Sequence, residues 1–322
     1  MFFKVYEAEV ANAISMNRVS ATAKAPGTCG ELVQGTLEGK PFLVTCPVAL
    51  WSEVTVRDPC IDVASCNAPK NLHSSVIEAD HASKMKQAIQ EVWKKAELRI
   101  NHSPLTGPEF SRRSNIPVGK GMSSSTADIA AAGMATARFL GIELTPEEVS
   151  TLALSIEPSD GIMFPGIHLL DHLYGRWSEP LGVPPSMEVL ILDPGGVVDT
   201  MAFNRRKGLC SLNRQKEPEV KKALQLVREG VEEKDPEKIG RGATISAQAN
   251  QKILFKKDLG KVIRLSRELK ALGVNVAHSG TVLGILLPPS KGKAEEAAAW
   301  ISSRFPQASV RAVSLVSGGI MS

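Results

Sequence analysis

Apolar residues recur with two different periods along this chain, and these periods predict a mixture of strands and helices. Alternation favours strands, whereas spacing of three and four places Met85, Ile89 and Val92 on one side of a helix. The predicted strands of the first half are residues 20–25, 42–46, 49–56 and 109–113, and its predicted helices are residues 81–96, 123–140 and 145–156. The last helix begins with Thr145-Pro146-Glu147-Glu148, a capping box with proline at the first helical position.

The second half repeats this mixture after a stretch rich in glycine and proline near residues 180–185. Its predicted helices are residues 217–231, 234–250, 257–272 and 291–303, and its predicted strands are residues 187–193, 274–278, 282–287 and 309–315. We predict an N-terminal extension over 1–18, one domain over 19–182 and a second over 183–322. Strands interleaved with helices in this way favour an α+β architecture.

Composition is compatible with two packed cores, because the chain has 322 residues of which 43% are hydrophobic and 22% charged. The formal net charge of +4 is too small to argue for nucleic acid, and no basic block is interleaved with aromatic residues. We interpret the basic clusters Arg205-Arg206-Lys207 and Lys256-Lys257 as solvated faces.

The cysteines favour a reducing compartment. There are five, an odd number, and none forms a C-x-x-C pair, so neither a disulfide scaffold nor a zinc site is indicated. Residues 1–18 carry Glu7 and Glu9 and do not have the pattern of a signal peptide, and no apolar run has the length of a membrane span. We therefore predict a cytoplasmic protein that binds neither membranes nor nucleic acid.

Two classes of hydrolase are disfavoured by their missing motifs. His168 and His172 are four residues apart, but no H-E-x-x-H surrounds them, which argues against a zinc hydrolase. The serines do not form the G-x-S-x-G elbow of an α/β hydrolase.

Residues 116–128, with the sequence IPVGKGMSSSTAD, carry the most specific signal for chemistry. Two loop glycines and a run of hydroxyls precede a segment of helix formers, and a helix N-terminus attracts phosphate through its unpaired N–H groups and its dipole. A tight turn with a serine N-cap is the simpler alternative. Three consecutive serines followed by Thr126 exceed what one cap requires, so we favour phosphate binding.

Neither common phosphate-binding glycine motif fits this stretch, since Lys120 lies between the glycines and Ser124 stands where the last glycine of G-x-G-x-x-G belongs. Instead it resembles the P-x-x-x-G-L-G-S-S-A-A loop of the GHMP kinases, with Ser123 in place of a glycine. Two further segments resemble the family's other motifs in the expected order. These are residues 24–35, KAPGTCGELVQG, and residues 277–286, AHSGTVLGIL.

The resemblance covers nearly the whole chain and implies an α+β, two-domain GHMP kinase fold, with an N-terminal domain like domain 2 of ribosomal protein S5 and a ferredoxin-like C-terminal domain. Within the family the motifs look most like the branch that uses ATP to phosphorylate L-threonine, a small-molecule substrate, for synthesis or salvage of the aminopropanol linker of cobalamin. A related kinase acting on homoserine or an isoprenoid alcohol is an alternative, and so is a catalytically silent binding protein. The oligomeric state stays open, with a homodimer as one alternative.

The resemblance assigns ATP to the loop, and Mg²⁺ to oxygen ligands beside it. The residues expected to hold the nucleotide are Pro117, Val118, Gly119, Lys120, Gly121, Met122, Ser123, Ser124, Ser125 and Thr126. Ser125 matches the family's metal-binding serine. An idle, exposed Lys120 is an equal alternative to a phosphate contact.

Two carboxylates three residues apart, Glu157 and Asp160, follow the capped helix. A polar helix end with a turn is an almost equally good interpretation. In the resemblance, Asp160 matches the acidic residue that orients the acceptor hydroxyl or deprotonates it as a base, and Glu157 is the second candidate Mg²⁺ ligand. Asp128, one turn into the helix after the loop, is interpreted as a favourable partner of the helix dipole.

The other motifs supply candidates for binding the substrate. The first motif contributes Lys24, Thr28 and Glu31, and Glu31 either receives the amino group of an amino acid or pairs with a structural lysine. Ser279 and Gly280 of the third motif are expected to close over phosphates or substrate, whereas we interpret His278 as a structural histidine. The turn after the strand 187–193 adds Asp199 and Thr200.

Overall fold

The computed structural model describes residues 19–58, 79–100, 108–196, 198, 208–289 and 292–322. Within these ranges the strands are β1 (Ser20–Leu37), β2 (Lys40–Arg57), β3 (Glu109–Ser114), β4 (Ile167–Leu170), β5 (Ser178–Gly182), β6 (Glu188–Asp193), β7 (Gly273–Val276), β8 (Leu283–Leu287) and β9 (Ser309–Ser314). The α-helices are α2 (Ala79–Ile100), α3 (Ser124–Phe139), α4 (Pro146–Ile156), α6 (Leu209–Gln215), α7 (Glu217–Glu232), α8 (Pro236–Ala249), α9 (Leu259–Glu268) and α10 (Lys293–Ser302), and a short 3₁₀ helix spans Asn250–Lys252.

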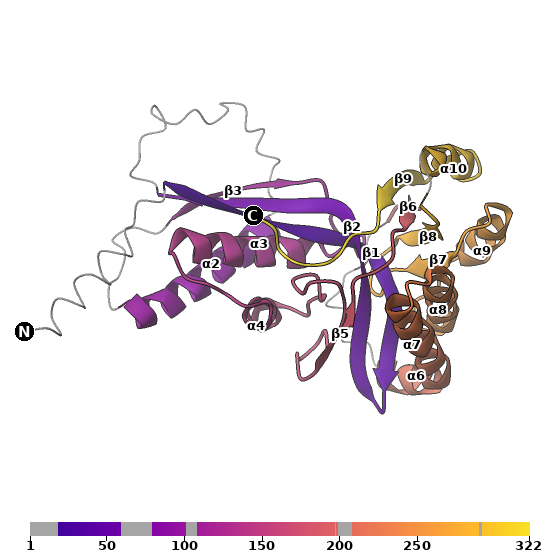
Figure 1. Cartoon of the computed structure of the whole chain (residues 1–322), viewed down its shortest axis with the longest axis horizontal. Helices are drawn as coiled ribbons and strands as arrows, with labels where there is room; N and C mark the ends of the chain where they lie inside the picture. Colours follow the sequence, from indigo (N-terminus) through magenta and orange to yellow (C-terminus); the bar gives the residue numbers. More distant parts are fainter. Residues whose placement is uncertain (1–18, 59–78, 101–107, 197, 199–207, 290–291) are drawn as a thin grey trace, which may run out of the picture.

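One sheet runs through both halves of the described chain (Figure 1). Its strand order is β5-β4-β2-β1-β7-β8-β6-β9, and β3 pairs with β2 on the edge opposite β1. The first half joins the second where Glu31 of β1 pairs with Val276 of β7. This mixture of helices and antiparallel strands confirms the predicted α+β class, whereas the division at residues 182/183 stays a proposal.

The long hairpin of β1 and β2 was not predicted at its full length. Each strand has 18 residues, and the two-residue turn Glu38-Gly39 has positive φ at both positions, as tight hairpins require. The register shifts at Pro26/Gly27 and on both sides of Glu31. These irregularities interrupt the alternation of apolar and polar residues, so the sequence beyond residue 25 did not predict a strand.

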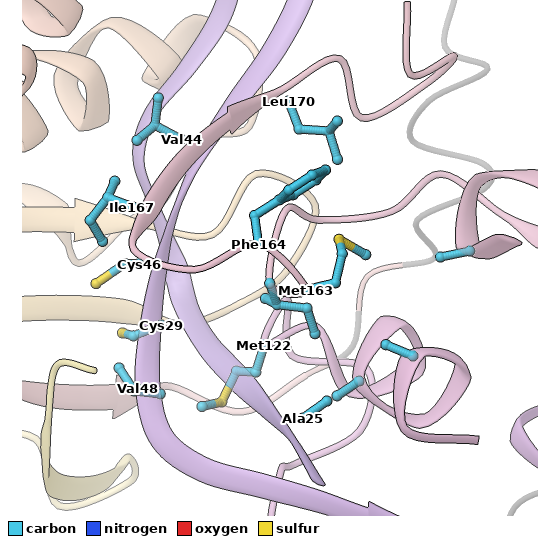
Figure 2. Packing of buried hydrophobic residues seen from close by; sticks show 14 of the residues in the cluster. Ala25, Cys29, Val44, Cys46, Val48, Met122, Met163, Phe164, Ile167 and Leu170 are labelled. Atoms are coloured by element: carbon cyan, nitrogen blue, oxygen red, sulfur yellow. The ribbon is translucent and has the colours of Figure 1, made fainter. Parts of the chain in front are cut away.

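Two helices, α2 and α3, pack on each other, and α3 packs on β1 and β2 (Figure 1). Their buried residues belong to the larger core, which also receives residues from α7 and α8. A second core lies between β6–β8 and the helices α9 and α10. Figure 2 shows Met122, which follows the glycines of the loop, among buried residues such as Ala25 and Met163. The loop is therefore fixed to the core by this side chain.

Local signals identified most helices. Thr145 and Glu148 form both hydrogen bonds of the predicted capping box, and α4 ends at Ile156 as expected. By contrast β4, β5 and α6 were not predicted. No helix in the described ranges combines the length and apolar character that crossing a membrane demands. Cys29, Cys46 and Cys210 are free thiols, and the two other cysteines lie outside the described residues.

Candidate active site

The predicted phosphate loop lies between β3 and α3, at the N-terminus of α3. Three alternate residues have left-handed backbones: Gly119 (φ 71°), Gly121 (φ 77°) and Ser123 (φ 58°). Such conformations turn neighbouring N–H groups toward one side and are typical of anion-binding turns. Ser123 is also the N-cap of α3, yet its side chain makes no capping bond and the first turn contains no acid. The N-terminal N–H groups of α3 are thus left without a side-chain cap, as an anion site needs.

The first motif clamps this loop from one side. Thr28 N donates to the carbonyl oxygen of Met122 at 3.0 Å, and the Thr28 and Ser123 hydroxyl oxygens are 2.7 Å apart. Ser123 Oγ in turn donates to Asp160 Oδ2 at 2.5 Å. The structure thus brings Thr28 and Asp160 together at the C-terminal end of the loop, through Ser123.

The third motif clamps the loop from the other side. Thr281 N donates to the carbonyl oxygen of Lys120 at 2.9 Å. Gly280 lies so close to Lys120 and Gly121 that a Cβ at residue 280 would collide with their backbone. Only glycine permits this approach, whereas the closure of Gly280 over phosphates or substrate stays a prediction.

The side chain of Lys120 is not idle, because it forms an ion pair with Asp193 at the end of β6. Its Nζ lies 3.0 Å from Asp193 Oδ2 and donates to the carbonyl oxygen of Gly196 at 2.7 Å. Asp193 Oδ1 accepts a 3.0 Å hydrogen bond from Thr281 Oγ1. Lys120, Asp193 and Thr281 therefore form a closed ring that joins the loop to the second half of the chain. Nothing in the sequence pattern had indicated Asp193.

A small polar cavity lies beside this loop. Its lining combines residues from all three motifs with the segment after α4, a histidine after β4 and a leucine of β2, namely Glu31, Leu43, Gly121, Pro158, Ser159, Asp160, His172, His278 and Ser279. The structure thus gathers Glu31, Asp160 and Ser279, which lie far apart in the sequence, around one space.

The two carboxylates of this cavity hold protons more tightly than ordinary acids. Desolvation raises the pKa of Asp160 to about 6, with a smaller contribution from Glu157, and the Ser123 hydrogen bond opposes this shift. Burial raises the pKa of Glu31 well above its usual value, and the charge of Asp160 raises it further. Asp160 therefore loses its proton at a pH near the working range of a general base.

Two buried lysines offset the charge of Glu31. Burial lowers the pKa of Lys216 to about 7 and that of Lys256 to about 8, and in both cases the charge of Glu31 opposes the shift. Lys256 Nζ donates to the carbonyl oxygen of Gly280, and Lys216 Nζ to Asn250 Oδ1 at 2.8 Å. The interpretation of Lys256 as part of a solvated face was therefore wrong, since it is only 8% exposed. A cluster of charges in sequence does not reveal that the chain folds back over one of them.

Both histidines of the cavity are neutral at physiological pH. Burial lowers the pKa of His172 to about 4 and that of His278 well below its usual value. The centroids of the two rings are 5.0 Å apart in an edge-to-face arrangement. The backbone N–H of His278 donates to Glu31 Oε2 at 2.6 Å. The structural interpretation of His278 did not foresee this contact, and no sequence signal had indicated His172. His168 lies apart, stacked on Phe164 at 3.9 Å.

The candidate metal ligands differ in their surroundings. Ser125 Oγ is buried and has no hydrogen-bond partner among the described residues. An orphaned hydroxyl at the start of α3 fits a hard cation, which takes oxygen ligands. Glu157 Oε2 instead forms a 2.9 Å ion pair with Lys84, so its role as a ligand stays a prediction. Within the described ranges no group of three or more histidine, cysteine, aspartate or glutamate side chains forms a metal site.

Three predicted substrate contacts are not part of this set. Lys24 is not among the residues that line the cavity, and its Nζ lies 5.3 Å from the ring centroid of Trp51. Asp199 and Thr200 lie outside the described residues.

Asp128 contacts side chains from three other elements. The interpretation of Asp128 as a partner of the helix dipole did not foresee these contacts. Asp128 is 1% exposed and forms an ion pair with Arg112 Nε at 2.7 Å. Ser52 Oγ donates to the same carboxylate oxygen as Arg112, and His81 Nδ1 lies 2.5 Å from the other oxygen, Oδ2. These contacts join α3 to α2, β2 and β3, and so fix the helix whose N-terminus forms the loop.

Comparisons with known proteins agree with this arrangement. Residues 83–166 match the N-terminal domain of the GHMP kinases. An L-threonine kinase of Citrobacter freundii is 32% identical over 83% of this chain and 86% of its own length, and an L-threonine kinase of Salmonella typhimurium is 34% identical over 83% of each. The solved structure of a homoserine kinase from Cytophaga hutchinsonii superposes with a TM-score of 0.66 at 15% identity, covering 95% of this chain and 98% of the other.

Proposed function

Because this chain belongs to the GHMP kinases, we propose that it transfers the γ-phosphoryl group of ATP to the hydroxyl of L-threonine, giving ADP and O-phospho-L-threonine. One observation carries the proposal: Asp160, a carboxylate with a pKa near 6, is hydrogen-bonded to the loop and lines a polar cavity beside it. The similarity to two L-threonine kinases supports threonine as the acceptor.

The nucleotide phosphates are assigned to residues 117–126. The left-handed residues of the loop and the uncapped N-terminus of α3 supply N–H groups, which stabilise phosphate charge without a side-chain movement. Gly280 covers the loop, and we assign Ser279 beside it to the same enclosure.

Asp160 is assigned to the proton of the acceptor. As the threonine oxygen forms its bond to the γ-phosphorus, the bond between that phosphorus and the β,γ-bridging oxygen breaks and ADP leaves. The hydroxyl proton passes to Asp160. A pKa near 6 leaves Asp160 ionised at neutral pH while keeping it more basic than an ordinary aspartate.

Mg²⁺ fits the oxygen ligands present. The unpartnered hydroxyl of Ser125 is the first candidate and the carboxylate of Glu157, once released from Lys84, the second. When bound, Mg²⁺ would supply charge neutralisation for the transferred phosphate.

Glu31 is assigned to the ammonium group of threonine, and Thr28 to the support of Ser123. Glu31 is 4% exposed and its pKa is raised by burial, so a positive group entering the cavity gains a partner there. Lys24, Asp199 and Thr200 are kept as weaker candidates for the substrate wall.

The biological setting follows from the resemblance of the motifs. We place the enzyme in the cytoplasm, in synthesis or salvage of the aminopropanol linker of cobalamin. A homodimer and the two-domain division at residues 182/183 belong to the same proposal.

A substrate panel tests the reaction. Purified protein with MgATP is given L-threonine, L-serine, L-homoserine or mevalonate, and ADP release is measured. We expect the highest kcat/KM with threonine, and mass spectrometry should identify phosphothreonine. Turnover with homoserine or mevalonate alone would move the protein to another branch of the family. Nucleotide binding without turnover of any acceptor would make it a silent binding protein.

A further inference from the structure

Leu43 is a buried leucine that does not serve the hydrophobic core. It is 3% exposed, yet it belongs to none of the three clusters of buried apolar residues in the described chain. Its neighbours Phe42 and Val44 are both fully buried in the larger core. Because successive strand residues point to opposite faces, Leu43 faces away from that core.

The strand register places Leu43 on the same face as Glu31. Thr45 of β2 pairs with Glu31 of β1, and Leu43 is two residues before Thr45. Side chains two apart on a strand, and side chains directly opposite on neighbouring strands, share a face. Leu43 accordingly lines the same cavity as Glu31 and Asp160.

The surroundings of Leu43 in this cavity are unusually polar. Glu31, Asp160, His172 and His278 all line the space, and Pro158 is the only other large apolar side chain among its lining residues. In the sheet register Leu43 is opposite the apolar Leu170 of β4, whereas the other groups that share the cavity with it are mostly polar. An apolar part of a ligand would give it a partner.

We propose that Leu43 contacts the methyl group of L-threonine and thereby sets the preference for threonine over serine. This inference rests on the proposed function. The methyl group is bonded to the carbon that carries the reacting hydroxyl, so a hydroxyl at Asp160 places the methyl against the nearby wall. Serine has hydrogen at this position and homoserine has no such branch, so neither offers Leu43 a methyl group to contact.

The expected effect is a change in selectivity rather than a loss of activity. One methyl or methylene group in an apolar pocket is worth roughly 10- to 200-fold in kcat/KM. We expect Leu43→Ala to reduce the threonine-to-serine ratio of kcat/KM by about 10-fold, mainly through the value for threonine. Leu43→Val removes less surface and should give an intermediate ratio.

The test compares these variants with Leu287→Ala, a matched truncation of a leucine that is 6% exposed in the second core. Each variant is assayed with threonine and serine, and its melting temperature is measured. The inference is supported if the two Leu43 variants lower the ratio in order of size while Leu287→Ala lowers only the melting temperature. An unchanged ratio in Leu43→Val, or equal losses for both amino acids in Leu43→Ala, would overturn it. Those results leave the proposed kinase activity standing, whereas inactivity of the wild type with both amino acids would remove both claims.

Discussion

Ser123 Oγ donates a 2.5 Å hydrogen bond to Asp160 Oδ2 from a left-handed backbone with φ 58°. A left-handed conformation costs a non-glycine residue about 1–2 kcal/mol. The resembling loop of the family has glycine here, which would avoid this cost but could not contact Asp160. Ser123 thus accepts backbone strain and in return holds the carboxylate of Asp160 by a hydrogen bond.

Replacing Ser123 should move the acidic limb of the pH profile. The hydrogen bond from Ser123 lowers the pKa of Asp160, so Ser123→Gly should raise that pKa above its value of about 6. Activity that needs ionised Asp160 rises as pH increases through this pKa, so the limb of kcat should shift to higher pH. Ser123→Ala should shift the limb similarly, but this variant should melt at a lower temperature than Ser123→Gly, because alanine keeps the left-handed strain that glycine avoids. An unmoved limb in both variants would remove Asp160 from the rate-limiting proton transfer.

Asp160→Asn should lower kcat by roughly 10²- to 10⁴-fold, the usual contribution of a positioned acid or base. Asparagine keeps the size of the side chain and a contact to Ser123, so KM for ATP should change less than about 2-fold. Steady-state kinetics with varied ATP at saturating threonine measure both quantities. Wild-type kcat in this variant would reduce Asp160 to a turn residue.

Ser125→Ala should weaken the response to Mg²⁺. The Ser125 hydroxyl has no hydrogen-bond partner among the described residues, so its removal should change the stability of the fold little. The same removal would take one oxygen ligand from the metal. We expect the half-saturating Mg²⁺ concentration to rise several-fold and kcat to fall, by more than in Ser123→Ala. The measurement is a Mg²⁺ titration at fixed ATP for both variants. Equal titrations would place the metal elsewhere.

Asp193→Asn should loosen the loop by opening its ring with Lys120 and Thr281. We expect KM for ATP to rise by about 10-fold, which corresponds to about 1.4 kcal/mol, with a smaller change in kcat. Lys120→Met and the double variant complete a cycle, and the two effects should be non-additive if the residues act as one unit. A lower KM for ATP in Asp193→Asn would instead mean that Asp193 holds Lys120 away from the phosphates.

Arg112→Met should destabilise the fold by about 3–5 kcal/mol, because it leaves the buried carboxylate of Asp128 without its charge partner. A control on the same pair of strands is Arg57→Met, which breaks an ion pair with Glu109 whose side chains are about half exposed. That change should cost less than about 1 kcal/mol. Urea unfolding of both variants gives the comparison. Equal losses would show that Asp128 is stabilised by its other partners, Ser52 and His81.

Sequence alone determined the features whose cause lies within a few residues. The capping box of Thr145 and Glu148, the glycines of the phosphate loop and the apolar face of α2 depend on neighbours one to four positions away. The three short motifs in their order were enough to predict the family by resemblance. The interleaved strand and helix patterns were enough to predict the α+β class.

The tertiary structure decided everything that depends on burial or on contact between distant segments. The burial of Lys256 depends on packing between segments far apart in the sequence. The contact of Asp193 with the phosphate loop and the place of Leu43 in the cavity lining have the same origin. The pKa of Asp160 has the same origin, since desolvation dominates it and only the folded chain excludes water. A linear pattern states which groups are present, but only packing sets the distances and the solvent exposure that turn them into a site.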